Sequence, residues 1–327
     1  MQILKTKKQI MAVAAIFIAV YHLWIPVFSS ASLAGRFENF FVSIGYIGVD
    51  LFFFLSAYTL TLSDMTSKWK FIFKRFKKVY PVFLIFCVIA LIIGKMSLSQ
   101  FFSTAIFLDF FKNGGGSFLW FIPALLLMYV AFPYCKSILS KYSPLKRLAI
   151  SIIVWVILSF AVEYGLSGIV DISIFLMRIP VILLGIFLAE YEGLWSKKRR
   201  LILAATLFLP GIVLVYQFGY LDKLTILFDS IFYIVALPCI LGLIFLLDVA
   251  FQGVSVKVVD ILGNATLELY CIQMLIGSEL VNIIFSITRI KILTNLITFI
   301  TVILLSIALS YLRRYINGRY IINRNPV

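Results

Sequence analysis

The sequence predicts an all-α protein that crosses a membrane about ten times, with both termini on the cytoplasmic side. The hydrophobic content, the length of the apolar runs and the distribution of cations support this fold class. Of the 327 residues, 63% are hydrophobic and 13% are charged, against roughly 45–50% and 25% in an ordinary soluble domain. With a mean hydropathy of +1.09, the chain would expose large apolar patches in water. The composition therefore excludes a soluble enzyme, a disordered chain and a nucleic-acid-binding module.

The apolar runs are long enough for transmembrane helices, which need roughly 20 residues. Their continuity excludes a β-barrel, whose strands alternate polar and apolar residues. The first run is too long for a typical signal peptide, although residues 29–34 would serve as a cleavage site. Without an internal repeat or a soluble segment, we expect a single transmembrane domain over residues 1–327. The predicted spans are 9–29, 41–62, 80–95, 117–134, 148–164, 172–189, 201–218, 226–247, 264–285 and 292–312.

The cations support this topology. Of the 29 Lys and Arg residues, 22 fall on the side of the termini, 6 on the other side, and Arg178 lies within a span. Loops rich in Lys and Arg stay in the cytoplasm. The asymmetry therefore places both termini there.

Neither a disulfide framework nor a metal site is expected. The cysteines lie in separate apolar segments without a CxxC pair, and the chain has 1 histidine. Such a set lacks the spacing of structural zinc ligands and of disulfide-rich domains. The cysteines are Cys87, Cys135, Cys239 and Cys271.

Ionisable residues inside the predicted spans point to function. His22, Asp50, Arg178 and Glu279 are expected about 9–14 Å below the outer surface, at 1.5 Å per residue. Each costs at least roughly 2.5–3.5 kcal/mol in a bilayer. They can pair as structural glue, with His22 as a satisfied hydrogen bonder. Alternatively, they form one polar plane in which His22, the only group here that exchanges protons readily near neutrality, does chemistry.

A strongly basic segment at 64–79 follows the second predicted span. It holds six cations interleaved with aromatic residues. One interpretation is that it lies on anionic lipid headgroups. The other is a cytoplasmic phosphate site, because Lys74 and Lys78 share a helix face and Arg75 offers bidentate contacts.

These residues, in this order, resemble the integral-membrane acyltransferase-3 family, which O-acylates cell-surface polysaccharides and related acceptors. The resemblance extends from the first predicted span to the ninth. The similar segments are Ala14-Ala15-Ile16 with Val20-Tyr21-His22, Gly45 to Ser56, Lys74 to Pro81, Leu119-Trp120-Phe121, Arg178-Ile179-Pro180 with Gly185, and Thr266 to Gln273.

The chain also departs from the family pattern. Met11 stands where the family usually carries an arginine, and Gln273 stands where it has a histidine. Lys74 and Lys78 replace arginines, which keeps the charge and loses the forked geometry. A non-catalytic relative is therefore one of the alternatives.

The resemblance implies transfer of an acyl group, most often acetyl, from cytoplasmic acyl-CoA to a hydroxyl of a cell-surface or lipid-linked glycan. His22 would lie about 20 Å from the inner end of its span, at 1.5 Å per residue, which is comparable to the length of a pantetheine arm. Acyl-CoA would be a co-substrate rather than a permanently bound cofactor. We assign His22 as general base, Asp50 to orient the imidazole, Arg178 to the oxyanion, and Lys74, Arg75, Lys78 and Tyr80 to coenzyme A.

Direct transfer and an acyl-histidine intermediate are equally compatible with the residues, and neither the acceptor nor the acyl length is readable. The other function class is an exporter or flippase of a glycan precursor, although paired broken helices typical of transporters are missing from the sequence. The expected partners are acyl-CoA, a glycan acceptor and membrane lipid, with no nucleic acid. The expected location is the plasma membrane of a bacterium, and no oligomeric state is indicated.

Overall fold

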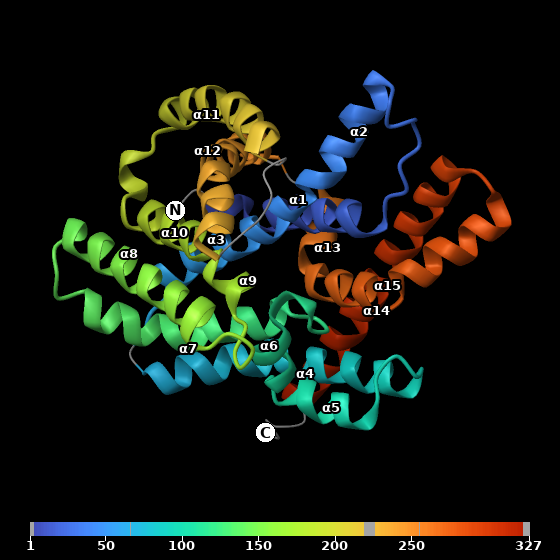
Figure 1. Ribbon diagram of the computed structural model, residues 1–327, viewed down its shortest axis with the longest axis horizontal. Coiled ribbons are helices and arrows are strands. Elements are labelled where there is room, and N and C mark those ends of the chain that lie inside the picture. Colours follow the sequence, from blue (N-terminus) through green and yellow to red (C-terminus); the bar gives the residue numbers. More distant parts are fainter. Residues whose placement is uncertain (1–2, 66, 219–225, 255, 323–327) are drawn as a thin grey trace. The chain divides into compact units, whose positions relative to one another are not determined.

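The computed structural model describes residues 3–65, 67–218, 226–254 and 256–322 (Figure 1). Helices make up 84% of the structure, and the described residues contain no strand. The predicted all-α class is confirmed. The chain divides into two compact units. The first unit comprises Met1–Leu51 and Leu247–Val327, and the second comprises Phe52–Leu246.

The first unit joins the two ends of the sequence. Its central helix α1 packs along α13 and α14, and α14 and α15 form a long hairpin (Figure 1). Helix α2 begins at its N-cap Ser32, whose hydroxyl accepts a hydrogen bond from the Gly35 N–H at 3.0 Å. The helices are α1 (Ile3–Leu23), α2 (Leu33–Ser43), η1 (Ile44–Tyr46), the start of α3 (Ile47–Thr61), the end of α12 (Ile226–Phe251), α13 (Lys257–Asn264), α14 (Thr266–Thr288) and α15 (Lys291–Ile322).

The second unit holds the middle of the chain. Helix α4 packs on α5 and α7, and α8 packs on α9 (Figure 1). Prolines lie inside four of the described long helices, which is tolerated in membrane helices because neighbouring groups satisfy the freed carbonyls. Besides the rest of α3 and most of α12, the helices are α4 (Lys68–Ile92), α5 (Leu98–Ala105), α6 (Leu108–Asn113), η2 (Gly114–Gly116), α7 (Phe121–Leu139), α8 (Pro144–Phe160), the π-helix η3 (Ala161–Gly165), α9 (Ser173–Leu176), α10 (Ile179–Glu190), η4 (Glu192–Leu194) and α11 (Lys197–Phe218).

In the part of the chain that the structure describes, eight helical stretches are long and apolar enough to cross a membrane. The predicted spans 9–29 and 80–95 overlap α1 and α4, which are not among the eight and which both carry lysines in their N-terminal turns. The count of ten and the cytoplasmic placement of the termini stay predictions, and residues 1–2 and 323–327 lie outside the described residues. The eight stretches are Leu33–Thr61, Phe121–Leu139, Pro144–Gly165, Ser173–Glu190, Lys197–Gln217, Tyr233–Phe251, Thr266–Thr288 and Lys291–Ile316.

The first helix is shorter than its apolar run. We predicted a span to residue 29, but α1 ends at Leu23. The next residues are apolar yet not helical, and Pro26 explains this because the residue before a proline is disfavoured in the α-region. The prediction of this boundary was therefore wrong by about two turns.

Candidate active site

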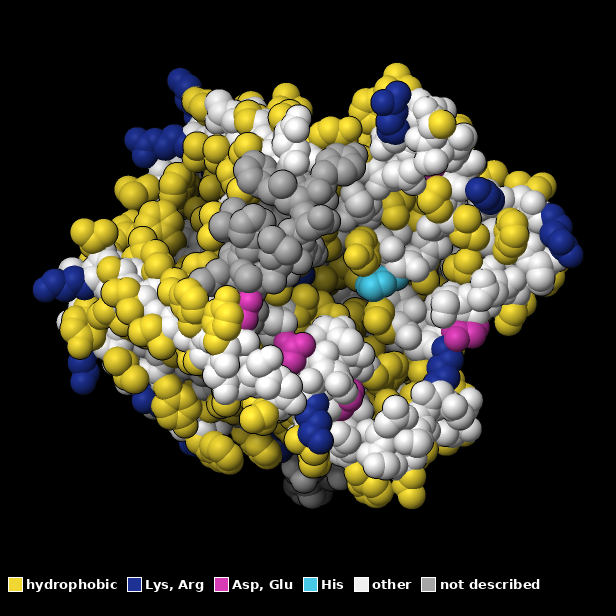
Figure 2. Space-filling view, viewed as in Figure 1, with side chains coloured by type: hydrophobic (Ala, Val, Ile, Leu, Met, Phe, Trp, Pro, Cys, Tyr) yellow, Lys and Arg dark blue, Asp and Glu magenta, His cyan; other side chains and the backbone are white. Residues whose placement is uncertain are grey.

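His22 lies in the last turn of α1. Its imidazole is exposed and meets the Tyr21 ring edge to face, with centroids 5.1 Å apart. Figure 2 shows this side chain in cyan at the surface of the face in view. We expected the histidine to lie well inside a span, and the early end of α1 brings it to the end of the helix instead. An exposed imidazole in a defined contact is accessible to a substrate.

Two glycines allow the Gly45 to Ser56 segment to pack tightly against α1. A Cβ atom on Gly45 would lie 2.7 Å from Cβ of Tyr21 and would overlap the carbonyl oxygen of Phe17. A Cβ atom on Gly48 would lie 2.7 Å from Cγ1 of Ile18. Only glycine permits so close an approach of two backbones. The segment thus runs antiparallel to α1, starting beside the residue that precedes His22.

This register fixes the height of Asp50 along α1. Asp50 is 1% exposed and occupies the first turn of α3, where the helix dipole favours a carboxylate. Two residues beyond Gly48, it lies about two helical turns from His22 toward the N-terminus of α1. The two side chains are therefore not in the single polar plane that we expected from the span lengths.

Helix α14 packs against α1, including the last turn that carries His22. Gly277 lies against the side chain of Leu23, and Gln273 follows on the same face one turn earlier. Gln273 is 4% exposed, so the residue that replaces the family's histidine is buried. Glu279, which we expected inside the span, is exposed and accepts a hydrogen bond from Ser278 at 3.2 Å.

In the second unit, Arg178 is the buried cation that we expected. It is 2% exposed and forms the N-cap of α10, directly before Ile179 and Pro180. Its guanidinium carbon lies 3.8 Å from the centroid of the Tyr233 ring. A planar guanidinium stacks on an aromatic face in a way that lysine cannot reproduce.

The basic segment forms the N-terminal part of α4, after the N-cap Ser67. Lys74 and Lys78 lie one turn apart on this helix, as predicted, and both are accessible from solvent. Arg75 instead faces the protein, where it donates hydrogen bonds to the Ser63 hydroxyl at 3.0 Å and the Phe71 carbonyl at 3.2 Å. Partial burial lowers the pKa of the Arg75 guanidinium, an effect that Tyr129 opposes. Arg75 therefore stabilises the end of α3 and the start of α4 in addition to any ligand role.

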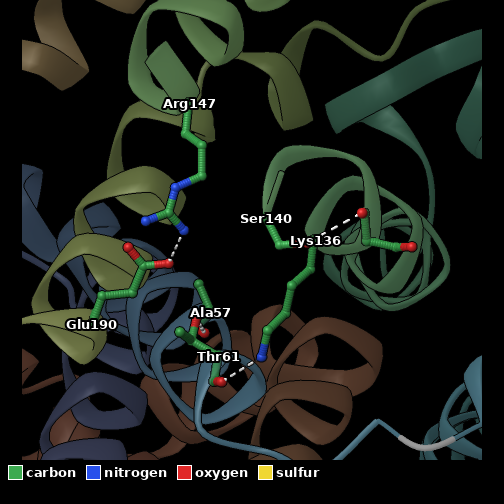
Figure 3. Close-up of polar contacts among 7 residues, drawn as sticks. Ala57, Thr61, Lys136, Ser140, Arg147 and Glu190 are labelled. Atoms are coloured by element: carbon green, nitrogen blue, oxygen red, sulfur yellow. Dashed lines mark hydrogen bonds and ion pairs between the residues drawn. The ribbon is translucent and has the colours of Figure 1, made fainter. Parts of the chain in front are cut away.

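A second cation binds the same end of α3 (Figure 3). The Lys136 ammonium donates to the Thr61 carbonyl at 2.8 Å, and cations stabilise helix C-termini in this way. Nearby, Arg147 and Glu190 form an ion pair at 2.6 Å between α8 and the end of α10. These contacts hold helices of the second unit together.

Tyr80, which we assigned to coenzyme A, has a structural contact. Its hydroxyl donates to the Ala105 carbonyl at 3.2 Å, and its ring stacks on Phe76 with centroids 4.5 Å apart. It ties α4 to α5, so its assignment to coenzyme A stays a prediction.

The sequence did not indicate how the residues after His22 are held. The segment 24–28 forms hydrogen bonds with three side chains of α2 and α15, namely Glu38, Lys291 and Asn295, which we call the anchor residues. Glu38 belongs to a predicted outer loop and Asn295 to the last predicted span, so only tertiary structure brings them together. Within the described ranges, no group of three His, Cys, Asp or Glu side chains is arranged to hold a metal.

The comparison with protein families decides the assignment. The Acyl_transf_3 family, described as an acyltransferase domain, matches residues 11–313, from α1 to α15. This chain is an Acyl_transf_3 protein. The resemblance predicted from the motifs is therefore confirmed, and with it a multi-pass membrane protein of an acyltransferase family. No curated protein and no solved structure matches the chain.

In this Acyl_transf_3 protein, the matched region includes all seven candidate residues. His22 and Asp50 belong to the first unit, on α1 and α3. Arg178 and the cations of α4 belong to the second unit. The residues that the sequence singled out are therefore divided between the two units, with the histidine in one and the basic segment in the other.

Proposed function

We propose that this Acyl_transf_3 protein is an O-acyltransferase that moves an acyl group, acetyl in the first instance, from cytoplasmic acyl-CoA to a glycan hydroxyl. The family membership over residues 11–313 supports acyl transfer. The observation that carries the proposal is the sole histidine at the end of α1, next to the glycine contact that begins the Gly45 to Ser56 segment.

His22 acts as the general base in this proposal. One imidazole nitrogen takes the proton of the acceptor hydroxyl while the oxygen attacks the thioester carbonyl. The tetrahedral intermediate collapses with cleavage of the carbon–sulfur bond, and the imidazolium returns its proton to the leaving thiolate. Such proton transfer typically contributes about 10²–10⁴-fold. In the alternative route, an imidazole nitrogen of His22 attacks the thioester carbonyl, and coenzyme A leaves as a thiolate that takes up the imidazole N–H proton. The acceptor hydroxyl then attacks the acyl-histidine, and its proton returns to the imidazole as the carbon–nitrogen bond breaks.

Asp50 and Arg178 are each proposed to stabilise a charge that develops during the reaction. The buried Asp50 carboxylate is proposed to orient the His22 imidazole and to stabilise its positively charged form. Arg178 is proposed to stabilise the oxyanion, as cationic groups do when they are aimed at charge that develops in the transition state. Its stacking on Tyr233 holds the guanidinium in one orientation.

Lys74 and Lys78 are proposed to bind the phosphates of coenzyme A. They are accessible, share one side of α4 and follow a helix start that is rich in cations. Arg75 supports them from the buried side, and Tyr80 keeps α4 in place through its bond to α5. This segment is predicted to lie on the cytoplasmic side of the membrane, where acyl-CoA is found.

A cellular experiment tests the function. The gene is deleted and then restored as wild type, as His22→Ala or as Tyr21→Phe, and acetyl signals of the surface glycan are measured by NMR. We expect acetylation to return with the wild type and with Tyr21→Phe, and to stay absent with an equally abundant His22→Ala. Acetylation by the His22→Ala protein would overturn the role of the histidine.

A binding experiment separates the enzyme from an exporter. We expect acetyl-CoA to raise the unfolding temperature of the purified protein, because a ligand that binds only the folded state stabilises it. Stabilisation by a lipid-linked sugar without any effect of acetyl-CoA would instead support an exporter or flippase.

A further inference from the structure

The segment that follows His22 is held by the carboxylate of Glu38. This side chain accepts hydrogen bonds from the Trp24 indole N–H at 2.8 Å, from the Val27 N–H at 2.8 and 2.9 Å, and from the Phe28 N–H at 2.9 Å. One residue of α2 thus satisfies three donors of a chain segment without regular structure. Hydrogen bonds to a charged acceptor are stronger than neutral ones.

The same segment is held by α15. The Asn295 amide accepts from the Ile25 N–H and donates to the Ile25 carbonyl, both at 2.9 Å. The Asn295 side chain is fully buried, whereas Ile25 is partly exposed. Lys291, one turn earlier, donates to the Pro26 carbonyl at 2.9 Å. The segment is therefore anchored from two elements that are distant in sequence.

These contacts act on the part of α1 that carries the histidine. The last carbonyls of a helix lack partners within the helix, and helix ends fray unless tertiary contacts hold them. The contact between Leu23 and Gly277 fixes one side of this turn. The anchor residues hold the chain directly after it. Together they contact the chain at the final turn of α1 and directly after it.

We propose that Glu38 and Asn295 are positioning residues that hold the His22 imidazole in one place. The consequence for catalysis rests on the proposed function, whereas the consequence for the histidine itself does not. A misplacement of about 1 Å in a reacting group can cost about 10²-fold in rate. The anchor residues touch the backbone on the C-terminal side of His22, which is where such a displacement would begin.

A spectroscopic test is direct because the chain has a single histidine. The protein is produced with ¹³Cε1-labelled histidine and purified through a tag without histidine, so that one NMR signal reports on His22. We expect one sharp signal for the wild type. In Glu38→Gln and Asn295→Ala the signal should broaden or divide, because the imidazole samples several positions.

Ser310→Ala is the matched control. Ser310 is also a buried polar residue of α15, and it donates to the Asn264 carbonyl at 3.2 Å, far along the helix from Asn295. We expect its histidine signal to remain that of the wild type, even if its unfolding temperature falls as much as that of the anchor variants. A wild-type signal in folded Glu38→Gln and Asn295→Ala would overturn the proposal, as would an equal disturbance in Ser310→Ala. Where an anchor variant does not fold, Lys291→Ala removes a single bond and serves in its place.

Kinetics add a second measurement. With acetyl-CoA as donor, the anchor variants should lower kcat by roughly 10–100-fold and leave KM for the donor nearly unchanged. A change in KM alone would contradict positioning. If the wild type transfers no acyl group, the proposed function fails, and the NMR comparison still decides whether the anchor residues hold His22.

Discussion

Gly48 of α3 lies directly against the backbone of Ala14 in α1. A Cβ atom on this glycine would overlap the Ala14 carbonyl oxygen and lie 2.7 Å from Cγ1 of Ile18. Between membrane helices, close packing of small residues replaces the hydrophobic effect as the driving force. The contact therefore fixes the start of α3, and Asp50 with it, at one height along α1.

Gly48→Ala is expected to destabilise the protein. Overpacking of a close contact costs about 1–3 kcal/mol, and the atoms that oppose the new methyl group include backbone, which cannot move aside easily. Thermal unfolding in detergent measures the loss. Gly165→Ala is the control, because a Cβ atom there meets no heavy atom within 4 Å. Equal unfolding temperatures for the two variants would contradict the contact.

The accessible lysines of α4 give a prediction about the donor. Lys74→Ala with Lys78→Ala should raise KM for acetyl-CoA by at least roughly tenfold, since a hydrogen bond to a charged group contributes about 1.5–3 kcal/mol. The effect on kcat should be small. Steady-state kinetics in proteoliposomes measure both.

Lys70→Ala with Lys77→Ala is the matched control for these lysines. It removes the same charge from another exposed part of the helix, where Lys77 lies over the Phe73 ring at 4.4 Å. KM should then stay near the wild-type value. If both pairs raise KM equally and weaken binding to anionic vesicles, the segment acts as a lipid-binding surface, the other interpretation of the sequence.

Arg178, whose guanidinium stacks on the Tyr233 ring, gives a prediction about catalysis. Arg178→Lys keeps the charge and loses the planar group, so transfer should fall by roughly 10²–10³-fold, the usual cost of removing an oxyanion-stabilising donor. Tyr233→Phe retains the ring under the guanidinium and should transfer at nearly the wild-type rate. Measured kcat values test both variants, and equal activity of Arg178→Lys and wild type would exclude the proposed role.

An ion pair of a buried glutamate and a partly exposed arginine in the first unit gives a prediction about stability. Glu268 of α14 pairs with Arg313 of α15 at 2.5 Å, and the glutamate side chain is only 3% exposed. Arg313→Ala leaves this carboxylate without that cation and should cost about 3–5 kcal/mol. Chemical denaturation of the reconstituted protein measures the change. The double variant Arg313→Ala with Glu268→Leu should be more stable than Arg313→Ala alone. If its loss of stability equals the sum of the losses in Arg313→Ala and Glu268→Leu, the two side chains are not directly paired.

The sequence predicted the helices well and their ends less well. Hydropathy located every predicted span on a helix, because long apolar runs have few alternatives in lipid. It extended the first span to residue 29, since Ile25, Val27 and Phe28 are as apolar as residues within a helix. The backbone after Leu23 is instead satisfied by side chains that hydropathy cannot detect.

The sequence predicted which residues are candidates for the site better than it predicted their positions in the fold. His22, Asp50 and Arg178 stand out because ionisable groups are rare in apolar runs. Their heights followed from assumed span ends, and the error at Leu23 was carried into the position of His22. Glu38 and Asn295 gave no local signal, because an acid in a loop and an amide in a span acquire their roles only through contacts between distant segments.

The first unit contains residues from both ends of the chain, and this has a consequence for biosynthesis. Domains generally fold in the order in which they leave the ribosome. Here α1 emerges first, yet Asn295 and Gly277 are added only after α12 has been made. The histidine therefore spends most of translation without the contacts that hold it, and a nascent chain that stops before α15 lacks the side chains that anchor the segment after His22.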